Sequence, residues 1–358
     1  MAEIIIRPES KQDFLETLEI KRLGWLSAYS EIFSAEAINN HFDSKKNNPD
    51  YIKEHTSLVQ NTKQLFVAEI DGTVVATMNI APKLENDDFV EIMWLYVHPS
   101  YQRMGIGKKL YDFAKYKILE SGTTKIHIEA LKENHIGCAF YTKTGGTIIS
   151  TRTRHMLGIE AELVTFEFDV NSPVLETERL ILRKYQETDI ADYFEYASSP
   201  DVGPRIGFEP HKTIESASAR LKIEMAKPFH FAIVLKNTNK VVGSVELMQT
   251  KTDRYSNLEI EENSKEIGFL LSPAYWGQGI MPEAAKAVLA FAFETLFVPA
   301  VYIGHAKANT QSARVQEKLG FKIVGTLENY RTWIDGNITA LIERKMTNLE
   351  WKLIKNTH

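Results

Sequence analysis

The sequence predicts a mixed α/β protein that consists of two domains of the same fold, residues 1–172 and residues 173–358. Strand and helix patterns that follow one another along the chain predict the fold class. The chain matches itself at an offset of 174 to 176 residues, which is too long for a solenoid repeat with its period of about 20 to 50 residues. A glycine-containing turn between a strand and a helix occurs in each half. The repeat therefore predicts two whole domains, each with its own turn.

Short motifs spread over both halves carry the repeat. The matched positions are Arg7 and Arg183, Asp13 and Asp189, Pro99 and Pro273, Gly105 and Gly279, Asn134 and Asn309, and Gly145 and Gly320. The joint between the domains is expected in the short polar segment 169–173, which contains a proline.

Composition and charge exclude several classes of protein. The 358 residues carry a formal net charge of −5, and neither half has the basic excess of a nucleic-acid-binding protein. The apolar stretches are too short and too polar for a membrane span, and the N-terminus lacks the pattern of a secretory signal, so a cytoplasmic location is expected. The single cysteine, Cys138, excludes an internal disulfide framework and a zinc cluster of cysteines, and no metal is expected.

The local pattern predicts each element of the first domain in turn. The expected elements are a strand at 4–7, a helix at 11–33, a hairpin of 65–70 and 74–80, a strand at 92–97, a helix at 106–118, and strands at 125–130 and 163–168. The helix at 11–33 is expected to bury Leu15, Leu18, Leu23 and Leu26. The second domain repeats this order from residue 180, with its hairpin at 231–235 and 241–247. The polar segments 42–51 and 250–264 are expected to be surface loops.

The first glycine turn lies between the strand at 92–97 and the helix that follows it. Gly105 and Gly107 bracket the start of the helix pattern. The first backbone N–H groups of a helix lack internal partners and carry partial positive charge, so such a turn binds anions. Gln102, Arg103 and Lys108 flank the turn and would add polar and charged groups to a phosphate site.

The spelling of this turn, Gln102-x-x-Gly105-x-Gly107, resembles the acetyl-coenzyme A signature of the GNAT superfamily of N-acetyltransferases. The resemblance implies that acetyl-coenzyme A is the co-substrate, that the turn wraps its pyrophosphate, and that the backbone of Leu95 and Val97 pairs with its pantetheine arm. By this resemblance the residues of the turn that bind the cofactor are Gln102, Arg103, Met104, Gly105, Ile106, Gly107 and Lys108.

Transfer of an acetyl group from a thioester to an amine needs a neutral amine and a proton for the leaving thiolate. Glu91 lies eleven residues before Gln102, and histone-type members of the superfamily place their general base at this spacing. The resemblance therefore implies that Glu91 is catalytic, and the alternative is a solvated carboxylate at the edge of the strand. His127 and Glu129 share one face of the next strand and could assist.

The segment that begins at Asn134 resembles the closing motif of the superfamily, Asn-x-x-Ala-x-x-x-Tyr-x-x-x-Gly. The resemblance implies that Asn134 contacts the pantetheine and that Tyr141 protonates the departing sulfur, although core packing would also explain this tyrosine. Gly137 stands where the motif has alanine. Cys138 has no base at a motif spacing and is expected to be an inert thiol. The pattern Trp-x-x-Ala-Tyr from Trp25 fits either contact with the acceptor or core packing.

Over residues 175–351 the second half resembles the Rim-type branch of the superfamily. Members of this branch acetylate N-termini of ribosomal proteins or small amines. Trp276 replaces the usual Gln or Arg of the turn, and Met281 replaces Gly or Ala. Ser312 is the implied proton donor, and a helix N-terminal cap is its alternative role. The cofactor-binding residues that the correspondence implies are Phe269, Leu271, Trp276, Gly277, Gln278, Gly279, Ile280, Met281 and Asn309.

The second half departs from the first at two further positions. Gln316 stands at the position of Tyr141. Alignment on the proline before each turn places Lys265 opposite Glu91, so Glu266 is expected to point to the other face unless a bulge corrects the register. The second domain, if active, is therefore expected to prefer weakly basic amines such as N-terminal α-amines, which need less help from a base.

The function that these features predict is direct N-acetyl transfer from acetyl-coenzyme A to a primary amine of a small molecule or of a protein N-terminus, in a ternary complex. The alternative is a sensor of acyl-coenzyme A in which one or both domains do not catalyse. A nucleotide-binding protein is excluded because the chain lacks a magnesium-binding motif. The expected partners include neither nucleic acid nor membrane.

Overall fold

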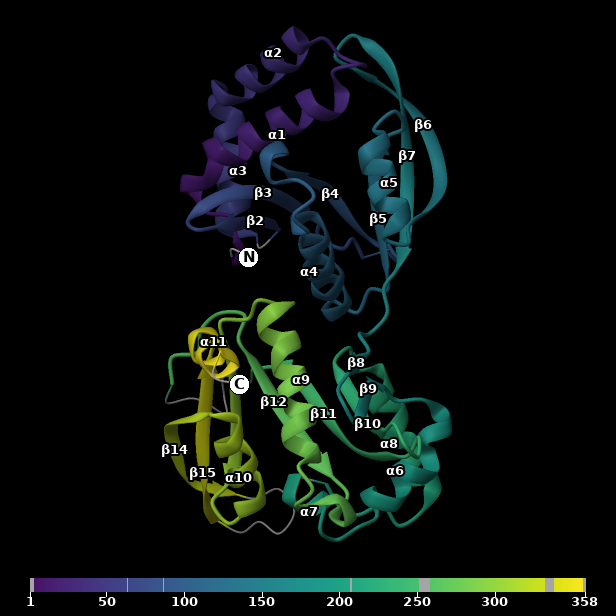
Figure 1. Ribbon diagram of the computed structural model, residues 1–358, viewed down its shortest axis with the longest axis vertical. Helices are drawn as coiled ribbons and strands as arrows, with labels where there is room; N and C mark the ends of the chain where they lie inside the picture. The colour runs from purple at the N-terminus through teal and green to yellow at the C-terminus, as the bar shows by residue number, and fades with distance from the viewer. Residues whose placement is uncertain are drawn as a thin grey trace. The chain divides into compact units, whose positions relative to one another are not determined.

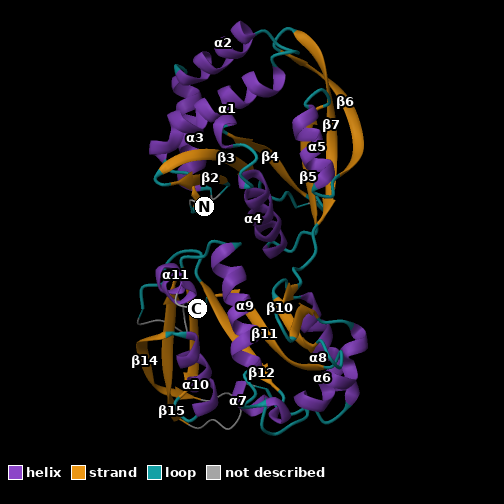
Figure 2. Cartoon of the chain, in the orientation of Figure 1, coloured by secondary structure: helices purple, strands orange, loops and turns teal. Residues whose placement is uncertain are grey.

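The computed structural model describes residues 3–62, 64–85, 87–206, 208–250, 258–331 and 338–356. The chain divides into two compact units, Met1–Asn171 and Ser172–His358. Each unit is a sheet with helices packed against it (Figures 1 and 2), so the mixed α/β class predicted from the sequence is confirmed.

The first unit contains, among its described residues, a seven-stranded sheet in the order β1-β2-β3-β4-β5-β7-β6. Its elements are β1 (Ile4–Pro8), η1 (Lys11–Asp13), α1 (Phe14–Tyr29), α2 (Ala35–Lys46), α3 (Pro49–Asn61), β2 (Leu65–Ile70), β3 (Thr73–Ile80), β4 (Val90–Val97), η2 (Pro99–Tyr101), α4 (Ile106–Glu120), β5 (Lys125–Leu131), α5 (His135–Lys143), β6 (Thr147–Met156) and β7 (Ile159–Asp169). Helices α1 and α4 cover opposite faces of the sheet at β3 and β4 (Figure 1).

The second unit contains, within the part of the chain described, an eight-stranded sheet in the order β14-β15-β13-β12-β11-β10-β9-β8. Its elements are β8 (Leu175–Glu176), β9 (Leu180–Lys184), η3 (Glu187–Asp189), α6 (Ile190–Ala197), α7 (Gly203–Ile206), α8 (Ile214–Ala226), β10 (His230–Leu235), β11 (Val241–Gln249), β12 (Lys265–Leu271), η4 (Pro273–Tyr275), α9 (Ile280–Glu294), β13 (Ala300–Ala306), α10 (Thr310–Leu319), β14 (Lys322–Arg331), β15 (Ile338–Thr347) and α11 (Asn348–Asn356).

The same ion pair anchors the start of each unit. The guanidinium of Arg7 donates to both carboxylate oxygens of Asp13 at 2.7 and 2.9 Å, and Arg183 donates to Asp189 at 2.7 and 2.8 Å. Burial opposes the charge of Asp13, but hydrogen bonds from Arg7 and Ser10 outweigh it and lower the pKa of Asp13 to about 2. These pairs explain why the Arg and Asp positions recur in the sequence.

Several predicted elements are confirmed in detail. Helix α4, which was predicted at 106–118, buries apolar side chains at helical spacing along its whole length, at Ile106, Leu110, Phe113, Ala114 and Ile118. The hairpin of β2 and β3 turns at Asp71 and Gly72, both with positive φ, as the dipeptide predicted. The corresponding hairpin of the second unit, β10 and β11, is also present.

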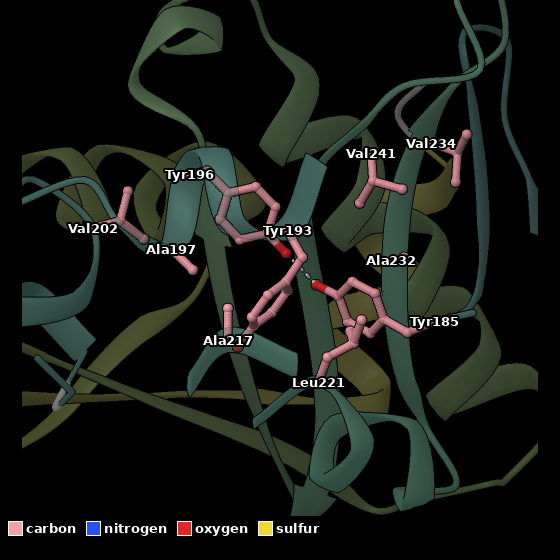
Figure 3. Close-up of a cluster of buried hydrophobic side chains, with 10 residues drawn as sticks. All are labelled: Tyr185, Tyr193, Tyr196, Ala197, Val202, Ala217, Leu221, Ala232, Val234 and Val241. Atoms are coloured by element: carbon pink, nitrogen blue, oxygen red, sulfur yellow. Dashed lines mark hydrogen bonds between the residues drawn. The ribbon is translucent and has the colours of Figure 1, made fainter. Parts of the chain in front are cut away.

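Three tyrosines form part of the second unit's core beside α6 and α8 (Figure 3). Tyr185 and Tyr196 join their hydroxyl groups in a hydrogen bond of 2.7 Å, and Tyr193 lies against both rings. Burial raises the pKa of Tyr193 to about 12. The core therefore satisfies a polar pair internally, as buried hydroxyl groups require.

The prediction of a loop at 42–51 is wrong, because this segment belongs to α2 and α3. Few of the residues of these helices are buried, mainly Ile38 and Phe42, so their apolar pattern is narrow. Their starts carry capping residues instead: Ser34 accepts from the Ala37 amide at 3.1 Å, and Asn48 accepts from the Asp50 amide at 2.9 Å.

Two further expectations concern helix α1 and the segment 250–264. Leu15 is 56% exposed, so the expectation that it is buried is wrong; it lies on the outer side of α1, whereas Leu18 is buried. Residues 251–257 lie outside the described residues, and residues 258–264 form neither helix nor strand. No helix among the described residues combines the length and the apolarity that crossing a membrane needs.

Candidate active sites

The first sheet opens between two parallel strands. β4 pairs with β5 at Val90–Ile126 and Glu91–His127, and the described residues show no register pair between these strands beyond that point. The strands therefore diverge toward their carboxyl ends, and the wedge between them begins beside Glu91.

The second sheet opens in the same way. β12 pairs with β13 at Lys265–Val301 and Glu266–Tyr302, and no later pair joins the two strands within the described residues. A glutamate again stands where the wedge begins.

Strand β4 contains one residue more than β12. Its register on β3 passes from Asn79–Trp94 to Ile80–Ile92, so Met93 is the extra residue of a bulge, with 51% of its surface exposed. The register of β12 on β11 is continuous over the whole strand.

This bulge corrects the register that alignment on the two prolines implied. Once Met93 is set aside, Glu266 corresponds to Glu91: their partners His127 and Tyr302 are 302 − 127 = 175 residues apart, as are the glutamates, 266 − 91 = 175. The expectation that Lys265 takes the position of Glu91 is therefore wrong. The physical reason is that the extra residue of β4 moves Glu91 onto the face that carries Trp94.

Both glycine turns have the same backbone conformation. Arg103 and Gly105 are left-handed, with φ of 62° and 83°, and Gly277 and Gly279 follow with φ of 77° and 76°. Gly105 and Gly279 are the N-caps of α4 and α9, so each helix directs its first N–H groups at the turn. Arg103 adopts a conformation that favours glycine, and its counterpart is in fact Gly277.

The space in front of these turns is open enough for a phosphate group to approach. A Cβ atom added at Gly105 or Gly277 would meet nothing within 4 Å. Lys108 is paired with Asp112 at 2.5 Å, one helical turn further on. The first backbone N–H groups of α4 rather than Lys108 are therefore the groups at the first turn that an anion would meet.

The second turn opens onto a cavity of about 1690 Å³ in the second unit. Its walls come from β11, β12, β13, the glycine turn, and the starts of α9 and α10. Residues that line it include Glu266, Phe269, Leu271, Trp276, Gly277, Gly279, Ile280, Met281, Asn309 and Ser312. The cavity joins the turn to Glu266, and its volume and donor groups fit a ligand as large as coenzyme A.

The two units differ in the sizes of two side chains, one at the glycine turn and one on the helix that faces it. A Cβ atom added at Gly107 would lie 3.7 Å from the ring of Phe140. In the second unit the corresponding residues are Met281 and Val315, both of which line the cavity. A larger residue on the turn is therefore matched by a smaller one on the helix, as close packing requires.

Glu91 lies in an environment that favours its neutral form. Burial and the nearby charge of Glu129 raise the pKa of Glu91, while Arg152 and His127 oppose the rise. Arg152 is bound to Glu129 at 2.5 and 2.7 Å, and His127 lies 2.9 Å from Glu167. The alternative candidates His127 and Glu129 thus both have structural partners, whereas Glu91 is half-buried at the wedge.

Asn134 and Tyr141 come from helix α5. The side-chain oxygen of Asn134 accepts from the Gly137 amide at 2.9 Å and caps the helix, and its amide donates to the Tyr29 hydroxyl at 3.3 Å. A Cβ at Gly137 would lie 2.6 Å from the Asn134 side chain in this conformation. Tyr141 packs against Phe166, and burial raises its pKa far above the usual range. Its phenol therefore keeps its proton at neutral pH.

The second unit replaces this tyrosine by a hydrogen-bonded chain. Gln316, which is fully buried, donates from its amide to the Ser312 hydroxyl at 3.0 Å, and its oxygen lies 3.0 Å from His305 Nδ1. Because Ser312 accepts this bond, its own proton is directed elsewhere, and Ser312 lines the cavity. Asn309 accepts from the Ser312 amide at 3.2 Å. Asn309 is therefore the N-cap of α10, so the alternative role of Ser312 as the cap is wrong, and Ser312 is the third residue of the helix.

A buried charged cluster lines the same cavity beyond Glu266. Glu224, His230 and Glu246 bring three potential ligand atoms within 4.8 Å of one another. Lys227 lies 2.6 Å from Glu224 and 3.0 Å from Glu246, so an ammonium group of the chain already neutralises these carboxylates. Burial opposes the charge of Glu224, yet His230 and Lys227 lower its pKa to about 2. The cluster is an internal ion-pair network.

Sequence reasoning missed this cluster and the role of His305. His230 and Glu246 are directly opposite each other on β10 and β11, and Glu224 reaches them from α8. The spacing of Ser244 and Glu246, two residues apart along β11, was the available signal, since polar residues at period two in a buried strand mark a face that is not ordinary core.

Comparison with known protein families matches both units. A family described as "Acetyltransferase (GNAT) domain" matches residues 179–322, and a family described as "Acetyltransferase (GNAT) family" matches residues 25–146. The two matches include both wedges, both glycine turns and the helices that follow them.

Individual relatives correspond to one half of the chain. The uncharacterized N-acetyltransferase p20 of Bacillus licheniformis is 28% identical over 182 residues, which are 48% of this chain and 97% of that protein. The spermidine N(1)-acetyltransferase of Thermoplasma acidophilum is 26% identical over 149 residues, 41% of this chain and 91% of that protein. A solved structure of PaiA N-acetyltransferase from Thermoplasma acidophilum in complex with coenzyme A is 23% identical, with a TM-score of 0.39, over 47% of this chain and 99% of the other.

Proposed function

Because this chain belongs to the acetyltransferase (GNAT) family in both of its halves and uses acetyl-coenzyme A as its co-substrate, we propose that it transfers the acetyl group directly to a primary amine in a ternary complex. The acceptor is a small-molecule amine or the N-terminus of a protein. The similarity to the spermidine N(1)-acetyltransferase of Thermoplasma acidophilum supports an amine acceptor. Residues 1–172 and 173–358 are proposed to act as one acetyltransferase domain each.

In the first domain Glu91 is proposed as the general base. It is half-buried where β4 and β5 part, and its raised pKa suits a group that must accept a proton near neutral pH. Tyr141 is proposed to donate the proton that the departing thiolate needs. The turn from Gln102 to Lys108, the backbone of Leu95 and Val97, and Asn134 are proposed to hold the cofactor.

In the second domain Glu266 and Ser312 are proposed for the same two tasks. Glu266 corresponds to Glu91 in register and lines the cavity with Ser312. The chain from His305 through Gln316 positions the serine hydroxyl. The second turn, from Trp276 to Met281, Phe269, Leu271 and Asn309 are proposed to bind coenzyme A.

The observation that carries this proposal is the matched placement of Glu91 and Glu266. Each glutamate lies where the two parallel strands begin to diverge, on the strand that leads to a glycine turn. A protein that merely senses acyl-coenzyme A has no need of a carboxylate at both positions. The test is to measure thiol release and product mass for the full chain with a panel of diamines, polyamines and N-terminal peptides. Tight cofactor binding without product from any amine would favour the sensor.

A further inference from the structure

The first unit buries a lysine on the face of the sheet that carries Glu91. Lys21, on α1, is 7% exposed, and its ammonium lies 4.0 Å from the centre of the Trp94 ring. Among the described residues it makes no ion pair within 4 Å. Burial lowers the pKa of Lys21 to about 8, against the opposing charge of Glu9, with Lys45 contributing to the decrease. An appreciable fraction of this amine is therefore neutral near pH 7.5.

The bulge at Met93 fixes which residues lie near this amine. Trp94 follows the bulge directly and lies opposite Asn79, and the bulge brings Glu91 onto the same face. Helix α1 lies against this face so closely that a Cβ at Gly24 would be 2.9 Å from the Tyr96 ring. Lys21, one turn before Gly24, thus reaches β4 at a point between Glu91, the proposed base, and the end of the strand that is proposed to bind pantetheine.

The surroundings of Lys21 contain polar atoms without partners. Within the described part of the chain, the Thr77 hydroxyl, the Asn79 side-chain oxygen and the Trp94 indole nitrogen are buried and have no hydrogen-bond partner. Buried polar atoms of this kind usually have a partner in the working protein, such as water or a ligand. Three of them on one face, beside an amine that makes no ion pair within 4 Å among the described residues, indicate a place where a polar reacting group is accommodated.

We propose that Lys21 is an internal acceptor, which the first domain acetylates when no other amine is bound. This rests on the proposed acetyl transfer by that domain. The neutral amine nitrogen attacks the thioester carbon of acetyl-coenzyme A, the carbon–sulfur bond breaks and an amide bond forms. Glu91 takes the proton lost by nitrogen and the thiolate gains a proton, so the products are acetyl-lysine and free coenzyme A.

The second domain has neither a lysine nor a tryptophan at the positions that correspond to Lys21 and Trp94. The position of Lys21 is occupied there by Ala197, 176 residues later, and the position of Trp94 by Gly268. Two other lysines of the first unit serve as matched controls. Burial also lowers the pKa of Lys45 and of Lys115, but Lys45 lies over the Phe42 and Tyr51 rings and Lys115 lies on α4. These two lysines share the lowered pKa of Lys21 but not its position against the Trp94 ring.

The experiment incubates the full chain with acetyl-coenzyme A that carries a deuterated acetyl group, without an added amine. Peptide mass spectrometry follows occupancy at Lys21, Lys45 and Lys115 over time. Positioning next to the reacting centre predicts acetylation of Lys21 at least about tenfold faster than of the other two. Glu91→Gln should remove this advantage, Lys21→Arg should abolish the labelled peptide, and the rate should not depend on protein concentration.

Equal labelling of the three lysines, or no label at Lys21, overturns the proposal. A parallel sample with added amines separates this outcome from failure of the proposed function, because thiol release with an external amine shows transfer even when Lys21 remains unmodified. Chain unfolded in urea supplies the non-enzymatic rates of the three sites. Cooperative unfolding of Lys21→Arg, measured by calorimetry, shows that the variant is folded.

Discussion

The indole N–H of Trp276 donates to the carbonyl oxygen of Leu271 at 2.9 Å, five residues before it. The side-chain amide of Gln102 makes the equivalent bond to Val97 at 3.3 Å. The two side chains differ in size and chemistry, yet both fix the glycine turn to the end of the strand that precedes it. The replacement of Gln by Trp therefore preserves the geometry of the anion site.

This bond yields the first prediction. Trp276→Phe keeps an aromatic ring beside Arg205 but loses the donor, and it should weaken coenzyme A binding at the second turn by roughly fivefold, the value of about 1 kcal/mol for one hydrogen bond. Trp276→Gln, which restores the donor of the first turn, should bind more tightly than Trp276→Phe. Calorimetric titration of each variant measures the difference. Equal affinities would assign the residue to packing alone.

The full chain should bind two equivalents of coenzyme A, one at each turn. Gly105→Val and Gly279→Val should each reduce the number to one, because a β-branched residue is strained at φ of 83° or 76°. Calorimetry with the unmodified chain and with both variants measures the stoichiometry. Gly72→Val, at a positive φ in a distant hairpin, controls for general destabilisation. One equivalent for the unmodified chain would contradict two working turns.

Glu91 should set the acidic limb of the pH–rate profile of the first domain. A base acts when ionised, and because its pKa is raised, the limb should lie above the pH range of an ordinary glutamate. Glu91→Gln should remove the limb and lower turnover by roughly 10²-fold or more. Glu129→Gln, which removes a nearby negative charge and frees Arg152, should move the midpoint to lower pH. A limb that stays in place in both variants would exclude Glu91 as the base.

The second domain should also accept strongly basic amines. Since Glu266 corresponds to Glu91, the expected restriction to weakly basic α-amines loses its basis. In a full chain inactivated at Glu91, Glu266→Gln should slow transfer to an alkylamine, with a pKa of about 10.4, more than to an α-amine of about 7.7 to 8.0. Initial rates with matched acceptors at one pH measure the two effects. A second-site rate that is the same with and without Glu266 would leave proton removal to solvent.

The Arg7–Asp13 pair should stabilise the first unit in a pH-dependent way. The pKa of Asp13 is lowered to about 2 in the folded chain, against about 3.9 when unfolded. The stabilisation is therefore fully present above about pH 4 and is lost as the pH falls toward 2. Asp13→Asn should lower the melting temperature at pH 6, and the difference from the unmodified chain should vanish near pH 2. Glu16→Gln, on the exposed side of α1, should show no such dependence.

Sequence patterns predicted the elements that bury a continuous apolar stripe or turn at a characteristic dipeptide. Helix α4 and the hairpin at Asp71 belong to this group. Helices α2 and α3 were missed because they bury few residues and depend on caps at Ser34 and Asn48. The wedge, the charged cluster around Glu224 and the surroundings of Lys21 were missed for another reason. They form from residues far apart in the sequence, whose relation depends on strand register.

The bulge at Met93 also governs how the two domains can be recombined. A chimera that exchanges β4 and β12 residue for residue would carry the extra position into the wrong sheet and turn the transplanted glutamate away from its wedge. A functional exchange must trade eight residues, Val90–Val97, for seven, Lys265–Leu271. The two halves share a fold although their corresponding strands differ in length by one residue. Grafts between them must therefore match residues by their position in the sheet and not by counting along the strand.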